Sequence, residues 1–441
     1  MEQQTPPGIS RRGFIRSVGG ATMAIAGAGL TGGGLLNVLR PESVSAQAGD
    51  PYDLWFAGTD GWMSLPASPA IPPFHPDDLA PDPFNTYIFG FRNLTGLNKN
   101  RAENQKFKAA HPAPMFWLEE NVPFHLRLGN LGLQLRPDLT DAHTLHWHGF
   151  RNVIPFFDGE PSGSVSVPIG REFTYVYVGR DPGTYMFHCH VEDVEHVQMG
   201  MTGLVFIRPA QDGNTALYPS GKYLYNDGDG STGFDREFGL FLSEMWAESH
   251  WADSHVQLPE WSDYHVDFAL LNGRTYPDTL EPNGSIDPFN PVRQNNGDLI
   301  APAGRPDLQY QPMSALVTCN AGDRVALRFA NLGFIESSMT LAGIPMKVVG
   351  KDAGLLRGRD GTDQTITTHT VAMGAGESRD VLFTAPPHSG GAGYDTYLLY
   401  NRAYARGSGN LGATLGGQST EIRVYPPGML GAQAHPNDLQ N

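Results

Sequence analysis

The feature that most constrains the fold is a weak internal repeat of strand-like segments. The stretch Val122–Gly132 aligns with Gly322–Gly333 at a shared Leu-Arg and a shared Asn-Leu-Gly. Farther along the chain, Gly183–His190 aligns with Asp395–Arg402, and both contain Thr-Tyr. Each stretch is a short run of apolar and β-branched residues that ends at a turn signal, which is typical of a β-strand. A chain that repeats such a unit is expected to fold as two similar β-sandwiches.

The composition agrees with an all-β fold. The 441 residues include 53 glycines and 35 prolines, which indicates many turns. Hydrophobic residues make up 40% of the chain and charged residues only 17%, so the chain can fill cores and does not resemble a disordered polymer. The two cysteines, Cys189 and Cys319, are too few for a disulfide scaffold. We therefore predict two tandem β-sandwiches that are stabilised by their cores.

The predicted domain boundaries follow from the repeat. We assign residues 50–210 to the first sandwich and residues 236–428 to the second. The segment 211–235 between them is rich in Gly, Asp and Ser and is predicted to be a linker or surface loop. The last residues, 429–441, are predicted to be a tail.

The N-terminal segment has the pattern of an export signal. Ser10–Ile15 contains a twin-arginine pair, an apolar Gly/Ala-rich run extends from Val18 to Leu39, and Val44–Ala46 is a small-residue cleavage candidate. We predict that residues 1–48 are a twin-arginine signal peptide, removed on export to a bacterial periplasm or beyond. The alternative is an uncleaved membrane anchor, although the many glycines weaken it. No later run approaches about eighteen apolar residues, so we expect no membrane association after cleavage.

The charge of the chain excludes one class of partner. Its 30 basic and 46 acidic residues give a formal net charge of −16. A surface of that sign repels phosphates, so nucleic acid is not an expected partner. The acidity favours solubility or the docking of a cationic partner.

Metal-binding side chains are concentrated in two short windows of the first copy. The first window is His143-Thr-Leu-His146-Trp-His148, and the second is His188-Cys189-His190, followed by His196 and Met201. Side chains alternate along a strand, so Cys189 is expected to face away from His188 and His190. One strand would then contact two metal sites.

The two expected sites differ in their ligands. On one side, Cys189 can be joined by His143, His196 and Met201. Two imidazoles, a thiolate and a weak thioether are the ligand set of a blue-copper electron-transfer site. On the other side lies a half-set of ligands for further copper ions, formed by His146, His148, His188 and His190. An isolated histidine is more often a core or surface residue, but the six named here, at these spacings around one cysteine, are improbable by accident.

These windows resemble the multicopper oxidases, specifically the small two-domain, laccase-like members built of cupredoxin domains. The resemblance rests on His146–Gly149, Asp158-Gly159, Pro168-Ile169, Gly183–Tyr185 and His188–His190. It implies an all-β fold of two tandem cupredoxin-like Greek-key β-sandwiches, and copper as the cofactor. The implied type 1 copper ligands are His143, Cys189, His196 and Met201. The implied ligands of a type 2/type 3 copper cluster are His146, His148, His188 and His190.

Several positions depart from the family pattern or leave an alternative open. Six residues separate Cys189 from His196, which predicts a longer ligand loop than the family has. Met199 is a rival axial ligand, but Met201 keeps the family's step from His196. Asp158 matches an acid that assists proton delivery in laccases, and its alternative interpretation is a turn residue. The second copy has lost every ligand, because Tyr400, Asn401 and Arg402 replace His-Cys-His and Ser337–Ala342 replaces the first window.

The resemblance implies an exported multicopper oxidase. A reducing substrate would be oxidised one electron at a time at a type 1 copper, and dioxygen would be reduced at a type 2/type 3 cluster. The expected partners are dioxygen and a small reducing substrate or an electron-donor protein. A homo-oligomer or a partner chain would have to complete the cluster, since this chain presents half of its histidines. The alternative is a periplasmic blue-copper electron-transfer protein or a nitrite-reductase-like two-copper protein with an incomplete trinuclear site. Two residues argue against the reductase: that family has Asp where His146 stands, and it lacks a histidine at the position of His190.

Overall fold

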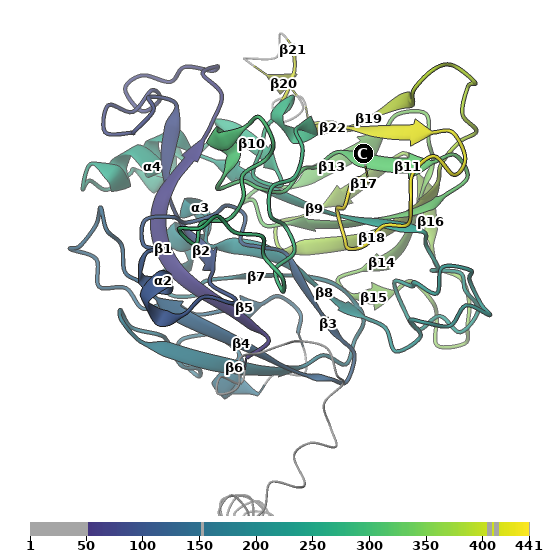
Figure 1. Cartoon of the computed structure of the whole chain (residues 1–441), viewed down its shortest axis with the longest axis horizontal. Coiled ribbons are helices and arrows are strands. Elements are labelled where there is room, and N and C mark those ends of the chain that lie inside the picture. The colour runs from purple at the N-terminus through teal and green to yellow at the C-terminus, as the bar shows by residue number, and fades with distance from the viewer. Residues whose placement is uncertain (1–51, 151–153, 404–407, 410–413, 441) are drawn as a thin grey trace, which may run out of the picture. The chain divides into compact units, whose positions relative to one another are not determined.

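The computed structural model describes residues 52–150, 154–403, 408–409 and 414–440 (Figure 1). The predicted signal peptide, residues 1–48, lies outside the described residues. Ala48–Asn441 forms one compact unit. Among the described residues, no helix has the length and apolar character needed to cross a membrane.

The first sandwich contains two four-stranded sheets. One has the order β2-β1-β4-β6, formed by β1 (Leu54–Ser64), β2 (Asn85–Asn93), β4 (Pro123–Asn130) and β6 (Glu172–Val178). The other has the order β3-β8-β7-β5, formed by β3 (Phe116–Glu119), β5 (His146–Trp147), β7 (Gly183–His188) and β8 (Thr202–Arg208). Alternation along the strands supplies the core. In β6, for example, Tyr175 and Tyr177 are buried while their neighbours are partly exposed.

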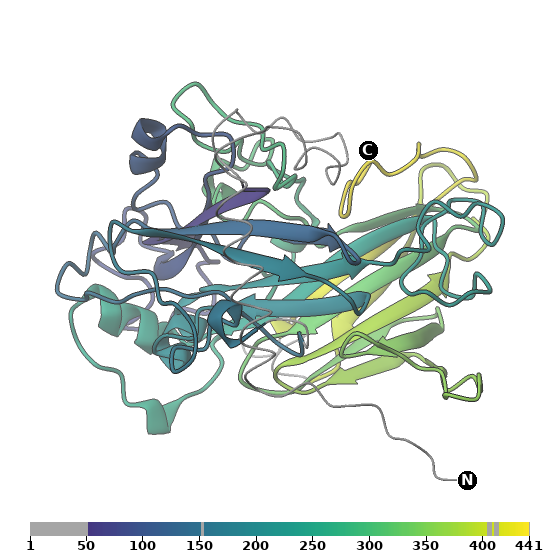
Figure 2. The same ribbon diagram turned by 90° about the horizontal axis from the view of Figure 1, so that it is seen from below.

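The second sandwich, drawn mainly in green to yellow in Figure 2, repeats this plan with additional strands. Its first sheet has the order β10-β9-β12-β18-β14-β15, and β16 also pairs with β14. Its strands are β9 (Arg236–Met245), β10 (Phe268–Leu271), β12 (Arg324–Asn331), β14 (Met346–Lys351), β15 (Gly354–Leu355), β16 (Ile366–Thr368) and β18 (Glu377–Thr384). The second sheet has the order β11-β22-β19-β13-β17. Its strands are β11 (Val317–Asn320), β13 (Ser337–Leu341), β17 (Thr370–Met373), β19 (Asp395–Asn401) and β22 (Ser419–Tyr425).

The remaining elements are short. The strand β20 (Ser408–Gly409) pairs antiparallel with β21 (Thr414–Leu415). The α-helices are α2 (Lys99–Glu103), α3 (Asp193–Met199) and α4 (Ala247–Ser254). The 3-10 helices are η1 (Pro155–Phe157), η2 (Trp261–Asp263), η3 (Asp278–Leu280) and η4 (Pro306–Leu308).

The sheet pairings confirm the all-β fold and the internal repeat. The parallel pair β1 and β4 corresponds to the parallel pair β9 and β12. The parallel pair β3 and β8 corresponds likewise to β11 and β22. The segments aligned in the sequence therefore occupy equivalent strands, with β4 matching β12 and β7 matching β19.

The two sandwiches share an apolar interface. Met186 and Phe206, from β7 and β8 of the first sandwich, belong to one buried cluster with Phe241 and Ala330, from β9 and β12 of the second. This contact places the ends of β5 and β7 beside the second sandwich.

The segments predicted to be a linker and a tail pack against the second sandwich. In the segment 211–235, Leu224 and Phe234 are buried in a cluster with residues of β12, β14 and β18. Near the C-terminus, Leu439 is buried in the core of the second sandwich, and the Asn437 side chain accepts a hydrogen bond from the Gly239 N–H. Both segments are thus part of the packed unit, although neither contains a regular helix or strand.

Candidate metal centres

The end of β7 brings the cysteine to its histidine neighbours. β7 ends at His188, so Cys189 and His190 lie just beyond the strand, which differs from the predicted continuous strand. The chain turns into α3 instead of forming the predicted long loop. α3 ends at Gly200, whose positive φ of 118° suits a glycine and whose N–H donates to the His196 carbonyl. His196 therefore lies on the last turn of a short helix that follows Cys189 closely.

The structure brings together three of the four predicted type 1 ligands. The Nδ1 atom of His196 lies 3.2 Å from the Cys189 sulfur, and the Nδ1 atom of His143 lies 3.9 Å from it. Potential ligand atoms of the three side chains all lie within 4.8 Å of one another, and all three side chains are fully buried. The Thr144 N–H also points at the sulfur, at 3.5 Å.

The electrostatics of this centre favour a thiolate. Burial raises the pKa of Cys189, but the charge of His196 and hydrogen bonds from His143 and His196 outweigh it and hold the pKa well below its usual range. Burial lowers the pKa of His196, whereas Cys189 and Asp141 raise it to about 10. Asp141 contributes because its carboxylate lies 3.6 Å from the His196 Nε2. A buried thiolate facing two imidazole nitrogens fits copper as a donor set.

The internal repeat distinguishes between the two candidate axial methionines, both of which are buried. The Cys189 N–H donates to the Met201 carbonyl, and in the second sandwich the Asn401 N–H donates to the Gln418 carbonyl. The two pairs of positions are therefore equivalent. The Asn401 amide donates to the Gln418 side chain at 2.7 Å, so the side chains of that pair face each other. The same register favours Met201 over Met199 as the side chain that faces Cys189.

A second group of imidazoles forms where β5 meets β7. His146 pairs with His188 across the two strands, and His148 follows β5 directly. Potential ligand atoms of these three histidines lie within 4.8 Å of one another. The Nε2 atoms of His148 and His188 are 2.9 Å apart, which is the spacing of two ligands at right angles about a metal ion with bonds of about 2.0–2.1 Å.

Backbone groups orient these three rings. His146 Nδ1 donates to the Asp158 carbonyl at 2.9 Å, and His188 Nδ1 donates to the Cys189 carbonyl at 2.6 Å. His148 is hydrogen-bonded to the backbone of Gly376. A carbonyl oxygen can only accept, so the Nδ1 atoms of His146 and His188 carry the protons and their Nε2 lone pairs are free. Converging lone pairs are a ready-made cation site.

The protonation of the three-histidine group also suits a metal. Burial lowers the pKa of His188 to about 3. Burial likewise lowers the pKa of His148, with the neighbouring His146 adding to the shift. Both rings are therefore neutral at neutral pH, which is the form that binds metal ions.

His190 and Asp158 lie beside the three converging rings and are not part of that group. The His190 ring centroid lies 4.8 Å from that of His146 and 5.4 Å from that of His188, but its nitrogens fall outside the converging group. Asp158 follows η1, and its carboxylate lies 3.4 Å from His146 Nδ1. Three of the four predicted cluster histidines thus converge, and Asp158 contacts one of them.

A cavity of about 420 Å³ adjoins the three-histidine group. His146 and His148 line one side of it, and Asp352, Gly376 and Ser378 of the second sandwich line the other. A small molecule in this cavity would therefore contact the rings and the second sandwich together.

The second sandwich carries no histidines at the equivalent pair. Thr340 pairs with Tyr400 where His146 pairs with His188 in the first sandwich. Asn401 takes the place of Cys189, and its amide is hydrogen-bonded to Gln418. A hydrogen bond between two amide side chains thus stands where the first sandwich has Cys189.

Two contributors to these centres were missed by the sequence reasoning. Asp141 lies two residues before His143, so an acid at that spacing was a visible signal. Gly376 lies in the turn between β17 and β18, far from either window, and nothing in its local sequence indicates a contact with His148.

Replacing Gly376 with alanine is expected to weaken metal binding at the three-histidine group by about 10–100-fold, as is usual when an orienting partner is disturbed. An added Cβ would lie 3.1 Å from His148 Nδ1. Gly361→Ala is the matched control, because Gly361 also has a positive φ but has open space at its Cβ. Copper titration followed by spin resonance measures the effect, and equal affinity in both variants would contradict it.

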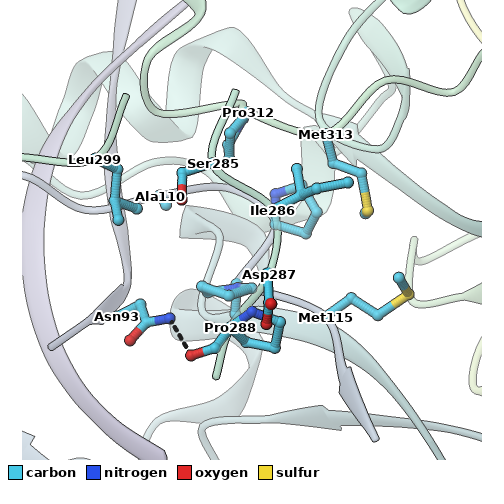
Figure 3. Close-up of a pocket in the computed structure, with 13 residues that line it drawn as sticks. Asn93, Ala110, Met115, Ser285, Ile286, Asp287, Pro288, Leu299, Pro312 and Met313 are labelled. Atoms are coloured by element: carbon cyan, nitrogen blue, oxygen red, sulfur yellow. Dashed lines mark hydrogen bonds between the residues drawn. The ribbon is translucent and has the colours of Figure 1, made fainter. Parts of the chain in front are cut away.

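A second pocket carries no comparable chemistry (Figure 3). It is lined mainly by apolar and proline side chains, including Met115, Ile286 and Met313. Its volume is about 20 Å³, which accommodates about one water molecule and no substrate.

The sequence around the two histidine windows is similar to that of known proteins. Residues 108–212, which include both histidine windows, match the sequence profile of the multicopper oxidases. Laccase-5 of Arabidopsis thaliana is 25% identical over 270 residues, which cover 59% of this chain and 36% of the laccase. The chain thus spans about a third of the length of this curated relative.

Solved structures share the fold. A blue copper oxidase from Nitrosomonas europaea superposes with a TM-score of 0.55 at 19% identity, covering 84% of this chain and 85% of that one. A copper-containing nitrite reductase from Thermus scotoductus superposes with a TM-score of 0.51 at 15% identity, covering 87% of this chain and 63% of that one. At these identities the likeness is one of fold, and it agrees with cupredoxin-like sandwiches.

Proposed function

We propose that this chain, which carries a multicopper oxidase domain at residues 108–212, is an exported copper oxidase. A reducing substrate or an electron-donor protein would give electrons one at a time at the Cys189 centre, and dioxygen would be reduced at the histidine group beside β5 and β7. The twin-arginine pattern at Ser10–Ile15 supports export to the periplasm or beyond.

The Cys189 centre would hold a type 1 copper through His143, Cys189, His196 and Met201. Its residues are fully buried, so they exclude water from the sulfur. Asp141 beside the His196 Nε2 helps to fix that ring. Bound copper would supply the one-electron redox steps, which none of these side chains supplies alone.

The single observation that carries the proposal is the direct connection between the two groups of imidazoles. Cys189 belongs to one group, and the preceding residue, His188, belongs to the other. The His188 ring also donates a hydrogen bond to the Cys189 carbonyl at 2.6 Å. With copper bound in both groups, these adjacent residues of one chain would provide a short path for electrons between the two centres.

The residues around the second group would manage substrate and protons. His146, His148 and His188 would hold copper, and His190 lies beside them. The Asp158 carboxylate would take part in proton delivery, and its distance of 3.4 Å from the His146 Nδ1 supports this role. A type 2/type 3 cluster needs further histidines, which a second copy of the chain or another polypeptide would supply.

One observation favours a second candidate function. The three converging imidazoles can bind one metal ion and leave a coordination position open toward the cavity, as catalytic metal sites do. The chain would then hold two coppers and act as a blue-copper electron carrier or as a nitrite-reductase-like protein. The fold likeness to a copper-containing nitrite reductase is consistent with this candidate.

Copper stoichiometry and oxygen uptake distinguish the candidates. For the oxidase, we expect four coppers per functional unit, an intense visible absorption and oxygen consumption with a generic electron donor. One or two coppers per chain without oxygen uptake would contradict the oxidase and favour the second candidate. The copper-free protein, prepared with a chelator, is the control and should consume no oxygen.

A further inference from the structure

A buried histidine outside the predicted ligand set contacts the segment that joins His196 to Met201. This segment, residues 197–200, contains the end of α3 and its cap and is called the ligand loop below. His111 is 1% exposed and uses both ring nitrogens. Its Nδ1 lies 3.2 Å from the Gly200 carbonyl, and its Nε2 lies 2.8 Å from the Ser243 hydroxyl. Ser243 belongs to β9, so the ring links the ligand loop to the second sandwich.

The partners fix the tautomer of this ring. The Gly200 carbonyl can only accept, so Nδ1 of His111 carries the proton. Its Nε2 then accepts from the Ser243 hydroxyl. Burial lowers the pKa of His111 to about 4, so the ring stays neutral at neutral pH and both hydrogen bonds persist.

Gly200 is a tightly packed point of the ligand loop. It lies between His196 and Met201, and its φ of 118° is costly for any residue with a Cβ. An added Cβ would lie 2.9 Å from the Phe89 carbonyl and 3.0 Å from His111 Nδ1. The position of the loop is therefore set by the groups packed on Gly200, and its displacement would move His196 and Met201 together.

The same loop is held from a second direction. Gln198 is buried, and its amide donates to the His250 Nε2 at 3.4 Å. The Nδ1 of His250, which lies on α4, in turn donates to the Tyr87 carbonyl at 2.6 Å. Both contacts come from rings that are themselves hydrogen-bonded to the surrounding fold, so the loop is restrained from two directions.

We propose that His111 is a positioning residue for the Cys189 centre, which holds the peptide between His196 and Met201 and connects it to β9 through Ser243. The inference rests on the proposed function, because it concerns the copper that the centre would hold. By holding the peptide that precedes Met201, His111 would affect the reduction potential and the charge-transfer spectrum of a copper bound at this centre. The second sandwich, which has lost its own ligands, thus acts on the centre of the first.

The test compares copper-loaded full-length variants by visible absorption, spin resonance and redox titration. His111→Leu removes both hydrogen bonds and is expected to shift the reduction potential and weaken the charge-transfer band. His111→Asn keeps a donor near the position of Nδ1 and should restore the wild-type values in part. Ser243→Ala removes only the contact to β9 and should give a smaller shift in the same direction.

The matched control is His75→Leu. His75 is also buried and also bonds a backbone carbonyl, that of Pro66, but it contacts neither α3 nor Gly200. Equal spectra and potentials in wild type, His111→Leu and His75→Leu would overturn the inference, as would equal shifts in both variants. If His111→Leu does not fold, the spectra and potentials of His111→Asn and Ser243→Ala are compared with those of the wild type. Wild-type values in both variants would then overturn the inference. Absence of the charge-transfer band from the wild-type protein would instead contradict the proposed function.

Discussion

Replacing Cys189 with serine is expected to abolish the intense charge-transfer absorption and to lower oxygen consumption to the level of the copper-free protein. A serine hydroxyl does not ionise near neutral pH, so it cannot supply the thiolate that this centre stabilises through His143 and His196. The three-histidine group keeps all of its nitrogens in this variant. We therefore expect it to retain the copper of that group, which spin resonance and metal analysis measure.

Cys319→Ser is the matched control for this prediction. Cys319 is also buried, but it lies in β11 of the second sandwich, where its thiol donates to the Arg423 carbonyl. Burial raises its pKa to about 12, so the thiol is neutral at neutral pH, and among the described residues it belongs to no group of converging metal-binding side chains. The control should keep the absorption and the activity. Retention of the band in Cys189→Ser, or its loss in Cys319→Ser, would contradict the assignment of the thiolate.

Replacing Arg328 with methionine is expected to lower the free energy of unfolding by about 3–5 kcal/mol, the usual cost of removing one partner of a buried ion pair. The Arg328 guanidinium is fully buried and contacts the carboxylates of Glu237 at 3.0 Å and Asp380 at 3.5 Å. It also donates to the Thr184 hydroxyl of β7, so the network joins the two sandwiches. Its removal leaves the Asp380 carboxylate buried without the cation paired with it.

Urea unfolding of the copper-free protein measures this effect. Burial raises the pKa of Glu237, while Arg208 and Arg328 lower it by a larger amount, so that carboxylate keeps one cation in the variant. The double variant Arg328→Met with Asp380→Asn removes the unpaired charge and should recover part of the loss. A double variant that is as unstable as the sum of the two single variants would show that the pair is not coupled. The exposed pair Lys347–Asp363 is a control, and Lys347→Met should change the stability by less than about 1 kcal/mol.

The sequence by itself determined the sandwiches and the main features of both centres. Strand patterns are local, and the shared Leu-Arg and Asn-Leu-Gly motifs marked β4 and β12 because equivalent strands keep similar inward-facing residues. The two histidine windows could be recognised in the sequence because metal ligands of one type recur at short spacing. The structure brings Cys189 to His143 and His196. The absence of metal ligands at Tyr400 and Asn401 could also be recognised, because these residues align with His188 and Cys189.

Only the tertiary structure decided which atoms face one another. The short helix α3 replaced the predicted loop because Gly200 ends it and packed groups surround it, and periodicity over seven residues does not reveal this. Three imidazoles converge without His190 because backbone groups orient their rings. The Cys189 carbonyl, which orients His188, is adjacent in the sequence, whereas the Gly376 backbone, which orients His148, comes from the other sandwich. Contacts such as those of Gly376 with His148 and of Ser243 with His111 join residues more than a hundred positions apart. Their physical cause is the packing of two sandwiches, which no local pattern of residues encodes.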